Sequence, residues 1–162
     1  MAGSILVDTN VLVYSVDIRD LAKLERAREV LDALHSCGRL VLSQQVLSEF
    51  ARVTTERIPR PLTAGQASAR VGEFARSTRI HPVTPAVIAD ALGVAERTGR
   101  SFWDAQLIAT ARVHGIATIV SEDFEGGAVC EGVRFVDPFA DGFDPTSLGV
   151  IVDEVAGGRL SD

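Results

Sequence analysis

The chain has 162 residues, of which 46% are hydrophobic and 23% are charged, so its length predicts one globular domain with a substantial core. No apolar run approaches the roughly 20 residues that a membrane-spanning helix needs, and the first residues lack the pattern of a secretory signal. Cys37 and Cys130 match no metal or redox spacing, which favours reduced thiols in a cytoplasmic protein. The formal net charge of −6 is unusual for a nucleic-acid binder, which leaves two interpretations: the chain does not bind nucleic acid, or its acids gather in one site where metal neutralises them and arginines surround it.

The first third of the chain begins with a strand pattern. Residues 4–7 are apolar on both faces and predict a buried strand that ends at Asp8. A short helix is expected over residues 11–16. Apolar residues spaced by three or four over residues 21–34, followed by Gly38, predict an amphipathic helix.

Strand and helix patterns alternate along the rest of the chain. Further strands are expected over residues 39–42, 80–83, 117–120 and 133–136. Helices are expected to begin after Ser43, after Thr84 with Pro85 at the first helical position, and after Ser101. This alternation predicts a parallel sheet that is covered on both faces by helices.

We therefore expect a three-layer α/β domain over residues 1–137, with a central, mostly parallel sheet of about four to five strands. The remaining residues, 138–162, are rich in Gly, Asp and Pro and contain an apolar stretch from Leu148 to Val155. We interpret them as a C-terminal extension whose role the sequence does not assign.

Two aspartates follow predicted strands. Asp8 ends the first strand, and Asp123 lies just past the strand over residues 117–120. Because functional sites of open parallel sheets lie beyond the carboxyl ends of the strands, these two acids are expected at one edge. Aspartate is also a common turn former and helix cap, so each residue taken alone has an equally good structural explanation.

Two further acids lie on apolar helix faces. Asp104 precedes a face of apolar residues at positions 107, 108 and 111, where an ionised group is costly unless it is paired or bound to metal. With Ser101 it could instead form a variant capping box. Glu49 lies between Val46 and Val53 on its helix, where it could also extend to water.

Four carboxylates at one site would repel each other and raise one another's pKa unless a cation joined them. Mg²⁺ and Mn²⁺ prefer oxygen ligands, and they assist phosphodiester hydrolysis by activating water and offsetting charge on the phosphoryl group. The pattern therefore favours metal-assisted hydrolysis of a phosphodiester, and it would reconcile an acidic chain with a nucleic-acid substrate.

Four sequence motifs carry a family resemblance. They resemble the motifs of PIN-domain proteins, in particular VapC-type toxins of toxin–antitoxin modules, and they occur in the same order and at similar spacing. The four motifs are Ile5–Asn10, Ser48–Phe50, Phe102–Ala105 and Ile119–Asp123. The resemblance covers roughly residues 5–137. It implies a Mg²⁺- or Mn²⁺-dependent endoribonuclease that is often a homodimer and is held inactive by a small antitoxin.

The resemblance also implies site residues. By motif match, the acidic metal site would consist of Asp8, Glu49, Asp104 and Asp123. Asp8 and Asp104 would be the direct metal ligands, and Asn10 and Ser121 would support the site through hydrogen bonds. Glu122 could assist or face away. The implied reaction cuts the RNA backbone and leaves a 5′-phosphate and a 3′-hydroxyl.

Other enzyme classes fit less well. Receiver domains and haloacid-dehalogenase-like phosphatases use a lysine late in the chain, whereas the only lysine here is Lys23. A histidine-based nuclease would draw on His35, His81 and His114, and nothing in the sequence brings these together. The remaining alternative is a non-catalytic PIN-like domain that acts only by binding another protein.

The sequence indicates partner surfaces only loosely. Four arginines are candidates for contacts with the RNA backbone, although exposed helix arginines are more commonly only solvated: Arg57, Arg60, Arg76 and Arg79. The apolar groove expected between the first helices is a candidate for binding a segment of the antitoxin.

Overall fold

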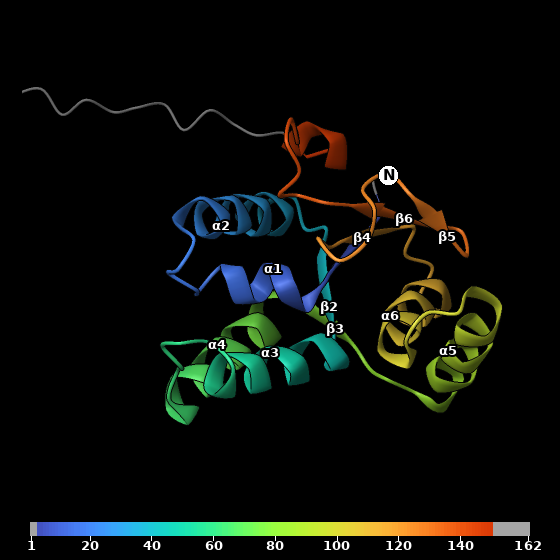
Figure 1. Cartoon of the computed structure of the whole chain (residues 1–162), viewed down its shortest axis with the longest axis horizontal. Coiled ribbons are helices and arrows are strands. Elements are labelled where there is room, and N and C mark those ends of the chain that lie inside the picture. The colour runs from blue at the N-terminus through green and yellow to red at the C-terminus, as the bar shows by residue number, and fades with distance from the viewer. Residues whose placement is uncertain (1–2, 151–162) are drawn as a thin grey trace, which may run out of the picture.

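A six-stranded sheet forms the centre of the computed structural model, which describes residues 3–150 (Figure 1). Its strands are β1 (Ile5–Val7), β2 (Leu40–Ser43), β3 (Arg79–His81), β4 (Thr118–Val120), β5 (Val129–Cys130) and β6 (Val133–Val136). They lie side by side in the order β3-β2-β1-β4-β6-β5. All neighbouring strands are parallel except β5 and β6. The predicted α/β class and mostly parallel sheet are confirmed.

Helices connect the strands on both faces of this sheet. They are α1 (Thr9–Tyr14), α2 (Leu21–Ser36), α3 (Gln44–Glu56), α4 (Ala64–Ser77), α5 (Pro85–Thr98), α6 (Phe102–Val113) and the short 3₁₀ helix η1 (Pro145–Leu148). Figure 1 shows α1 to α4 on one side of the sheet and α5 and α6 on the other. Right-handed crossovers produce this division, because β2 and β3 are added on one side of β1 and β4 on the opposite side.

The helix boundaries follow from local capping. Ser43, Thr84 and Ser101 each accept a hydrogen bond from the backbone N–H three residues later, at 3.1, 3.3 and 3.2 Å. These bonds satisfy N–H groups that the first helical turn leaves without partners. Gly99 ends α5 with a φ of 69°, a left-handed conformation that glycine adopts without strain. The helix starts predicted after Ser43, Thr84 and Ser101 are confirmed, whereas the first helix begins at Thr9, two residues before the expected start.

The sheet has more strands than the four to five expected, because β5 and β6 form a tight hairpin. Cys130 pairs with Val133, and the two loop residues Glu131 and Gly132 have φ angles of 53° and 82°. Two positive φ angles match the twist that two-residue hairpins require. A strand of two residues, Val129–Cys130, is too short to give a periodic hydrophobic pattern, so the sequence did not indicate it.

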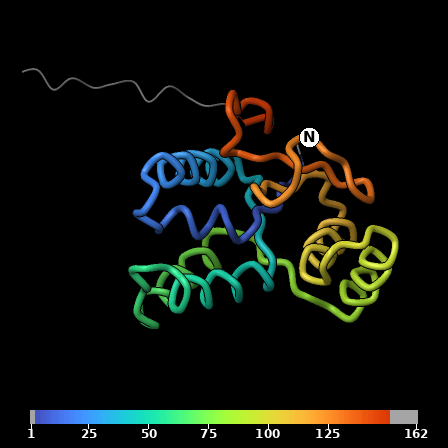
Figure 2. The backbone as a smooth tube through the Cα atoms, viewed as in Figure 1, coloured from blue at the N-terminus to red at the C-terminus, as the bar shows by residue number. Residues whose placement is uncertain are grey.

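The chain after β6 returns toward the first helices (Figure 2). The Phe139 ring packs edge-on against Tyr14, with centroids 5.0 Å apart. The Arg39 guanidinium donates to the carbonyl of Leu148, and Leu148 and Val150 are buried. Residues 151–155 of the apolar stretch noted in the sequence, and all that follow, lie outside the described residues.

Among residues 3–150, no helix is both long enough and apolar enough to cross a membrane.

Candidate active site

The carboxyl ends of β1 and β4 lie next to each other at the centre of the sheet. Val7 pairs with Val120 at the end of both strands, and the backbone N–H of Asp8 donates to the Val120 carbonyl at 2.9 Å. The order of connections reverses between β1 and β4, and such switch points of open sheets form the crevices where ligands bind. Asp8 and Ser121 are therefore placed side by side at this crevice.

A network of polar side chains joins the residues that follow the two strands. The Ser121 hydroxyl donates to Asp8 Oδ2 at 2.7 Å. The amide of Asn10 donates to Ser121 Oγ and to Asp123 Oδ2, both at 3.1 Å. Residues more than a hundred positions apart in the sequence thus form one cluster, and it contains the two sequence-predicted acids Asp8 and Asp123.

Asp8 is a buried carboxylate in an unfavourable electrostatic environment. It is only 9% exposed, and it caps α1 by accepting the Thr9 backbone N–H at 2.6 Å. Burial, with smaller contributions from the charges of Asp123 and Glu49, raises the pKa of Asp8 to about 6, although the hydrogen bonds from Ser121 and Thr9 oppose this shift. No arginine, lysine or histidine of the described residues forms an ion pair with Asp8.

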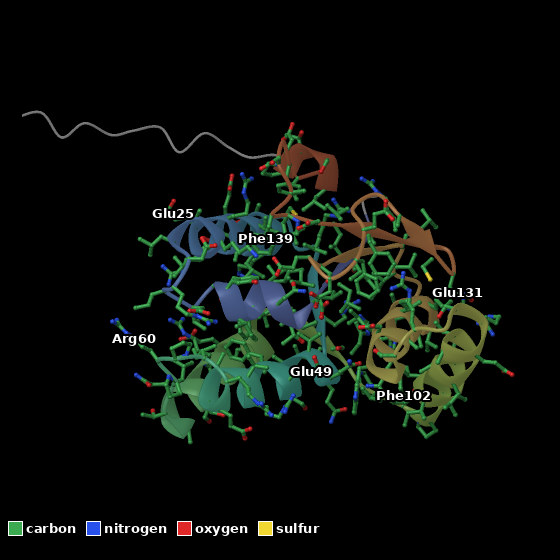
Figure 3. All side chains as sticks on the ribbon, in the orientation of Figure 1. Glu25, Glu49, Arg60, Phe102, Glu131 and Phe139 are labelled. Carbon is green, nitrogen blue, oxygen red and sulfur yellow. The ribbon has the colours of Figure 1, made fainter. Side chains whose placement is uncertain are left out.

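Glu49 approaches the cluster from a different helix, α3. Figure 3 labels Glu49 near the end of α3 that lies beside α6. Its two carboxylate oxygens accept hydrogen bonds from the Thr9 hydroxyl at 3.1 Å and from the Gln45 amide at 2.9 Å. Thr9 is adjacent to Asp8, so this bond connects α3 directly to the start of α1. Glu49 is half-buried, and it is held by polar donors instead of extending freely to water.

Asp104 lies in the first turn of α6 and is also half-buried. Ser101 accepts its backbone N–H at 3.2 Å, but the Asp104 carboxylate makes no return bond, so the capping box considered above is only half formed among the described residues. The carboxylate has no hydrogen bond or ion pair with residues 3–150. Its link to the site runs through Trp103, whose carbonyl accepts from the Gln45 amide at 3.0 Å.

The oxygen atoms of these side chains suit a hard divalent cation, but the side chains do not form a preassembled metal-binding site. Within residues 3–150, no three His, Cys, Asp or Glu side chains converge closely enough to enclose an ion. Mg²⁺ does not require this, because it usually keeps several waters and takes one or two carboxylates from the protein. The carboxylate oxygens of Asp8 and its acidic neighbours, and the absence of an ion pair to Asp8 among the described residues, therefore fit such an ion.

Glu122 faces away from this cluster, which settles the question that the sequence left open. Its carboxylate accepts from the Tyr14 hydroxyl and from Lys23 Nζ, both at 2.6 Å. The backbone nitrogen of Glu122 lies 3.5 Å from the side-chain oxygen of Asn10, Oδ1. The single lysine of the chain therefore balances Glu122 and leaves its neighbour Asp123 on the side of Asn10.

The structure corrects one expectation about histidine. His81 and His114, for which the sequence gave no reason to meet, have ring centroids 4.1 Å apart. They meet because His81 ends β3 and His114 caps the end of α6, and sequence spacing does not show which helix end reaches which strand. Neither ring forms a hydrogen bond with the four carboxylates within residues 3–150, so the pair gives no support to a histidine-based nuclease.

Several residues beside the site were not singled out as site residues from the sequence. Thr9 and Gln45 donate hydrogen bonds to Glu49. The sequence could have indicated them only by position, because Thr9 follows Asp8 and Gln45 precedes Glu49 by one helical turn. Arg52 lies one turn beyond Glu49 on α3, whereas Arg60, one of the four arginines proposed for RNA contacts, lies well away from Glu49 (Figure 3).

Comparison with known proteins identifies the class to which this fold and site belong. The sequence pattern of the PIN domain family matches residues 5–128. The chain therefore belongs to the PIN domain family. No curated protein matches the chain in sequence.

Solved structures of the same fold come from bacteria and archaea. A protein from Pyrobaculum aerophilum is 21% identical, with 92% of this chain and 91% of that chain covered at a TM-score of 0.60. The DNA-bound VapBC complex from Salmonella typhimurium is 17% identical, with coverage of 84% and 98% and a TM-score of 0.63. The Mycobacterium tuberculosis toxin VapC20, described as cleaving the sarcin–ricin loop, is 22% identical, with coverage of 72% and 87% and a TM-score of 0.56.

Proposed function

We propose that this chain is a Mg²⁺- or Mn²⁺-dependent endoribonuclease, the toxin of a toxin–antitoxin pair, acting in the cytoplasm. The observation that carries the proposal is the buried Asp8 carboxylate, which has Asp123 and Glu49 beside it and no positive side chain of residues 3–150 to balance them. Membership of the PIN domain family and likeness in fold to the M. tuberculosis toxin and the S. typhimurium complex support it.

Asp8 and Asp104 would hold the cation directly, and Glu49 and Asp123 would complete its surroundings. When bound, such an ion lowers the pKa of a water molecule and offsets the negative charge of the scissile phosphodiester. Balancing the buried charge of Asp8 would also lower the pKa of that carboxyl again and keep it ionised below neutral pH as well.

The polar neighbours orient the carboxylates for this task. Ser121 and the Thr9 backbone fix the two oxygens of Asp8, and Asn10 turns Asp123 toward Asp8. Thr9 and Gln45 hold Glu49 from both sides. Hydrogen bonds of this kind keep ligands in place, and losing one typically lowers metal affinity or activity about 10- to 100-fold.

A protein partner would hold the toxin inactive, and the chain would act as a homodimer. Ile18 and Leu21 are 49% and 64% exposed at the start of α2. Ile18 lines a cavity with Ile58 and Pro59, which would give an antitoxin segment an apolar surface between the loop before α2 and the segment after α3. The solved complexes from Salmonella typhimurium and Klebsiella pneumoniae each pair a protein of this fold with an antitoxin.

The decisive experiment is cleavage of a mixed RNA pool by the purified chain, with Mn²⁺ or with a chelator. We expect cleavage that requires the metal and is abolished in Asp104→Asn. Asp32→Asn is the matched control, because Asp32 is an exposed acid on α2 outside the cluster. An active Asp104→Asn protein would overturn the assignment of the site, and metal-independent cleavage would overturn the mechanism.

Thermal unfolding gives a second measurement that does not depend on activity. A ligand that binds only the folded state raises stability by about 2.7 kcal/mol at a hundred times its Kd. Mg²⁺ or Mn²⁺ should therefore raise the Tm of the native chain and of Asp32→Asn, and much less that of Asp8→Asn. Equal shifts in all three proteins would mean that the cation binds elsewhere. Binding of a protein partner without metal response or cleavage would favour the non-catalytic alternative.

A further inference from the structure

A cavity of about 800 Å³ adjoins the carboxylate cluster between α3 and the start of α6. Its α3 wall includes the neighbours Gln44 and Gln45, then Glu49 four residues after Gln45 and Arg52 three residues after Glu49, so these side chains share one face of that helix. Trp103 and Gln106 of α6 form the opposite wall. Glu49 belongs to both the cavity and the acidic cluster, so a molecule in the cavity would lie beside the proposed metal site.

Buried hydrogen bonds preorganise the wall nearest the carboxylates. Gln45 is only 8% exposed, and its amide nitrogen donates both to Glu49 Oε1 at 2.9 Å and to the Trp103 carbonyl at 3.0 Å. Its amide oxygen accepts from Gln106 at 2.8 Å. Gln45 therefore fixes the backbone of Trp103, the residue before Asp104, and holds α3 and α6 at a set separation across the cavity.

Trp103 presents a large aromatic surface at the rim. It is 62% exposed, and it is the only tryptophan in the chain. Phe102 supports it edge-on, with ring centroids 5.6 Å apart (Figure 3 labels Phe102). An exposed aromatic residue is common by itself. Here it borders a cavity, and stacking of an unpaired base on such a ring typically strengthens binding several-fold or more.

The α3 wall also carries two polar side chains that can bind a ligand, Gln44 and Arg52. Gln44 accepts the Val83 backbone N–H at 3.3 Å through its amide oxygen, which leaves its NH₂ group without a partner among residues 3–150. The Arg52 guanidinium likewise forms no hydrogen bond or ion pair with residues 3–150. Carboxamides pair with the edges of bases, and arginine binds phosphates.

We propose that this cavity, lined by Gln44, Arg52 and Trp103, binds an unpaired nucleotide of the RNA next to the scissile phosphate. The base stacks on Trp103 and meets the Gln44 amide, and Arg52 binds a neighbouring phosphate. This rests on the proposed ribonuclease function and narrows its substrate to single-stranded RNA, because a paired base cannot enter. Two apolar residues, Val83 and Trp103, among otherwise polar lining residues favour a nucleotide over an apolar peptide segment.

Trp103 fluorescence tests the proposal directly, because no other tryptophan contributes to the signal. The Asp104→Asn protein, in Mg²⁺, is titrated with a single-stranded hexanucleotide RNA and with a sugar–phosphate oligomer of the same length that lacks bases. We expect saturable quenching by the RNA and little by the abasic oligomer. Equal responses to both oligomers, or a response only to a protein partner, would overturn the nucleotide assignment.

Cleavage by chains with all four carboxylates intact supplies the second arm. Trp103→Ala should raise KM about tenfold or more and flatten the base preference beside the cut, with a smaller loss in kcat. Trp103→Phe should recover much of the affinity, which a merely structural defect would not predict. Leu92→Ala, at an exposed apolar residue of α5 outside the cavity, is the matched control.

The two proposals fail in different ways. If the native chain cuts RNA and both Trp103 variants keep its KM and cut-site preference, the cavity proposal is wrong and the nuclease stands. If the native chain cuts no RNA in either metal, the nuclease proposal fails, and the cavity proposal fails with it as a substrate site. Arg52→Ala should weaken binding of all sequences alike and reduce its salt dependence, whereas Gln44→Ala should change base preference.

Discussion

Two acidic regions of the molecule differ in how their charge is balanced. Glu131 lies between Arg97 Nη2 and Arg112 Nη1, at 2.8 and 3.1 Å, and Arg112 also pairs with Asp90 at 2.9 Å. The hydrogen bond from Arg97 lowers the pKa of Glu131. At the end of β1, burial raises the pKa of Asp8 to about 6, and no arginine or lysine among residues 3–150 pairs with it.

The difference separates acids whose charge neighbouring arginines balance from acids whose charge residues 3–150 leave unbalanced, and the proposed metal site lies at the second kind. Surface ion pairs such as those of Glu131 contribute little to stability and need nothing further. A buried carboxylate beside other carboxylates is costly, and it is retained where a ligand or a metal repays the cost. Charge balance, and not the number of acids, therefore distinguishes the candidate site of this acidic protein from its other acidic surfaces.

Neighbouring residues show the same contrast on a smaller scale. Glu122 is balanced by Lys23 at 2.6 Å and by the Tyr14 hydroxyl, whereas within residues 3–150 the Asp123 carboxylate accepts a hydrogen bond from the Asn10 amide alone, at 3.1 Å. The two side chains leave the same loop toward different partners. If charge balance distinguishes the two acids, a substitution of Asp123 and a substitution of Glu122 will affect RNA cleavage differently.

Cleavage should respond most strongly to this pair. Asp123→Asn should reduce metal-dependent RNA cleavage by about 100-fold or more, since outer residues of a metal site already account for 10- to 100-fold. Glu122→Gln should keep cleavage within a few-fold of the native chain. Initial rates with Mn²⁺ on one RNA substrate measure both, and equal losses in the two variants would break the distinction between balanced and unbalanced acids.

The buried Asp8 should make the metal-free protein less stable near neutral pH. A raised pKa means that the folded state holds the proton more tightly than the unfolded state, so ionised Asp8 disfavours folding. The shift from 3.8 to about 6 corresponds to roughly 2 to 3 kcal/mol above pH 6. Asp8→Asn keeps the cap on α1 and should therefore be more stable than the native chain in chelator at pH 7.5.

The pH dependence of stability tests whether the higher stability of Asp8→Asn comes from the removed charge. As pH falls from 6 toward 4, Asp8 protonates in the folded state and the penalty disappears, so the two proteins should converge in stability. Urea unfolding at several pH values measures this. Glu131→Gln is the matched control, because it removes a carboxylate whose pKa is lowered and should be no more stable than the native chain. A constant gain at every pH would mean that packing, not charge, explains it.

Most of the fold could be predicted because its signals are local. Strands buried on both faces gave continuous apolar runs, and the side chains of Ser43, Thr84 and Ser101 marked helix starts within a few residues. The hairpin of β5 and β6 was missed because a two-residue strand has no period. The contact between His81 and His114 was missed because it depends on where a helix end meets an edge strand.

The sequence predicted that two acids of the candidate site meet, but not the contacts around them. The acids Asp8 and Asp123 follow strands that pair in register, so their meeting was expected from topology. The contributions of Thr9 and Gln45 were not, because hydrogen bonds between helices leave no spacing in the sequence. The direction of Glu122 depends on Lys23, 99 positions earlier, and only the structure shows that contact.

The ion pair of Lys23 and Glu122 gives the smallest and most specific test of the comparison. Its side chains are 32% and 23% exposed, so Lys23→Met should lower stability by only about 1 kcal/mol or less. The double variant Lys23→Met/Glu122→Gln should lose little beyond either single variant, because both remove the same contact. Urea unfolding measures this cycle, with Arg70→Met, which breaks an exposed pair with Glu73, as the control.

Cleavage by Lys23→Met should stay near that of the native chain, because Lys23 balances an acid that does not face the site. A loss as large as that of Asp123→Asn would show that releasing Glu122 disturbs the carboxylates, and the two neighbouring acids would then have to be treated as one unit.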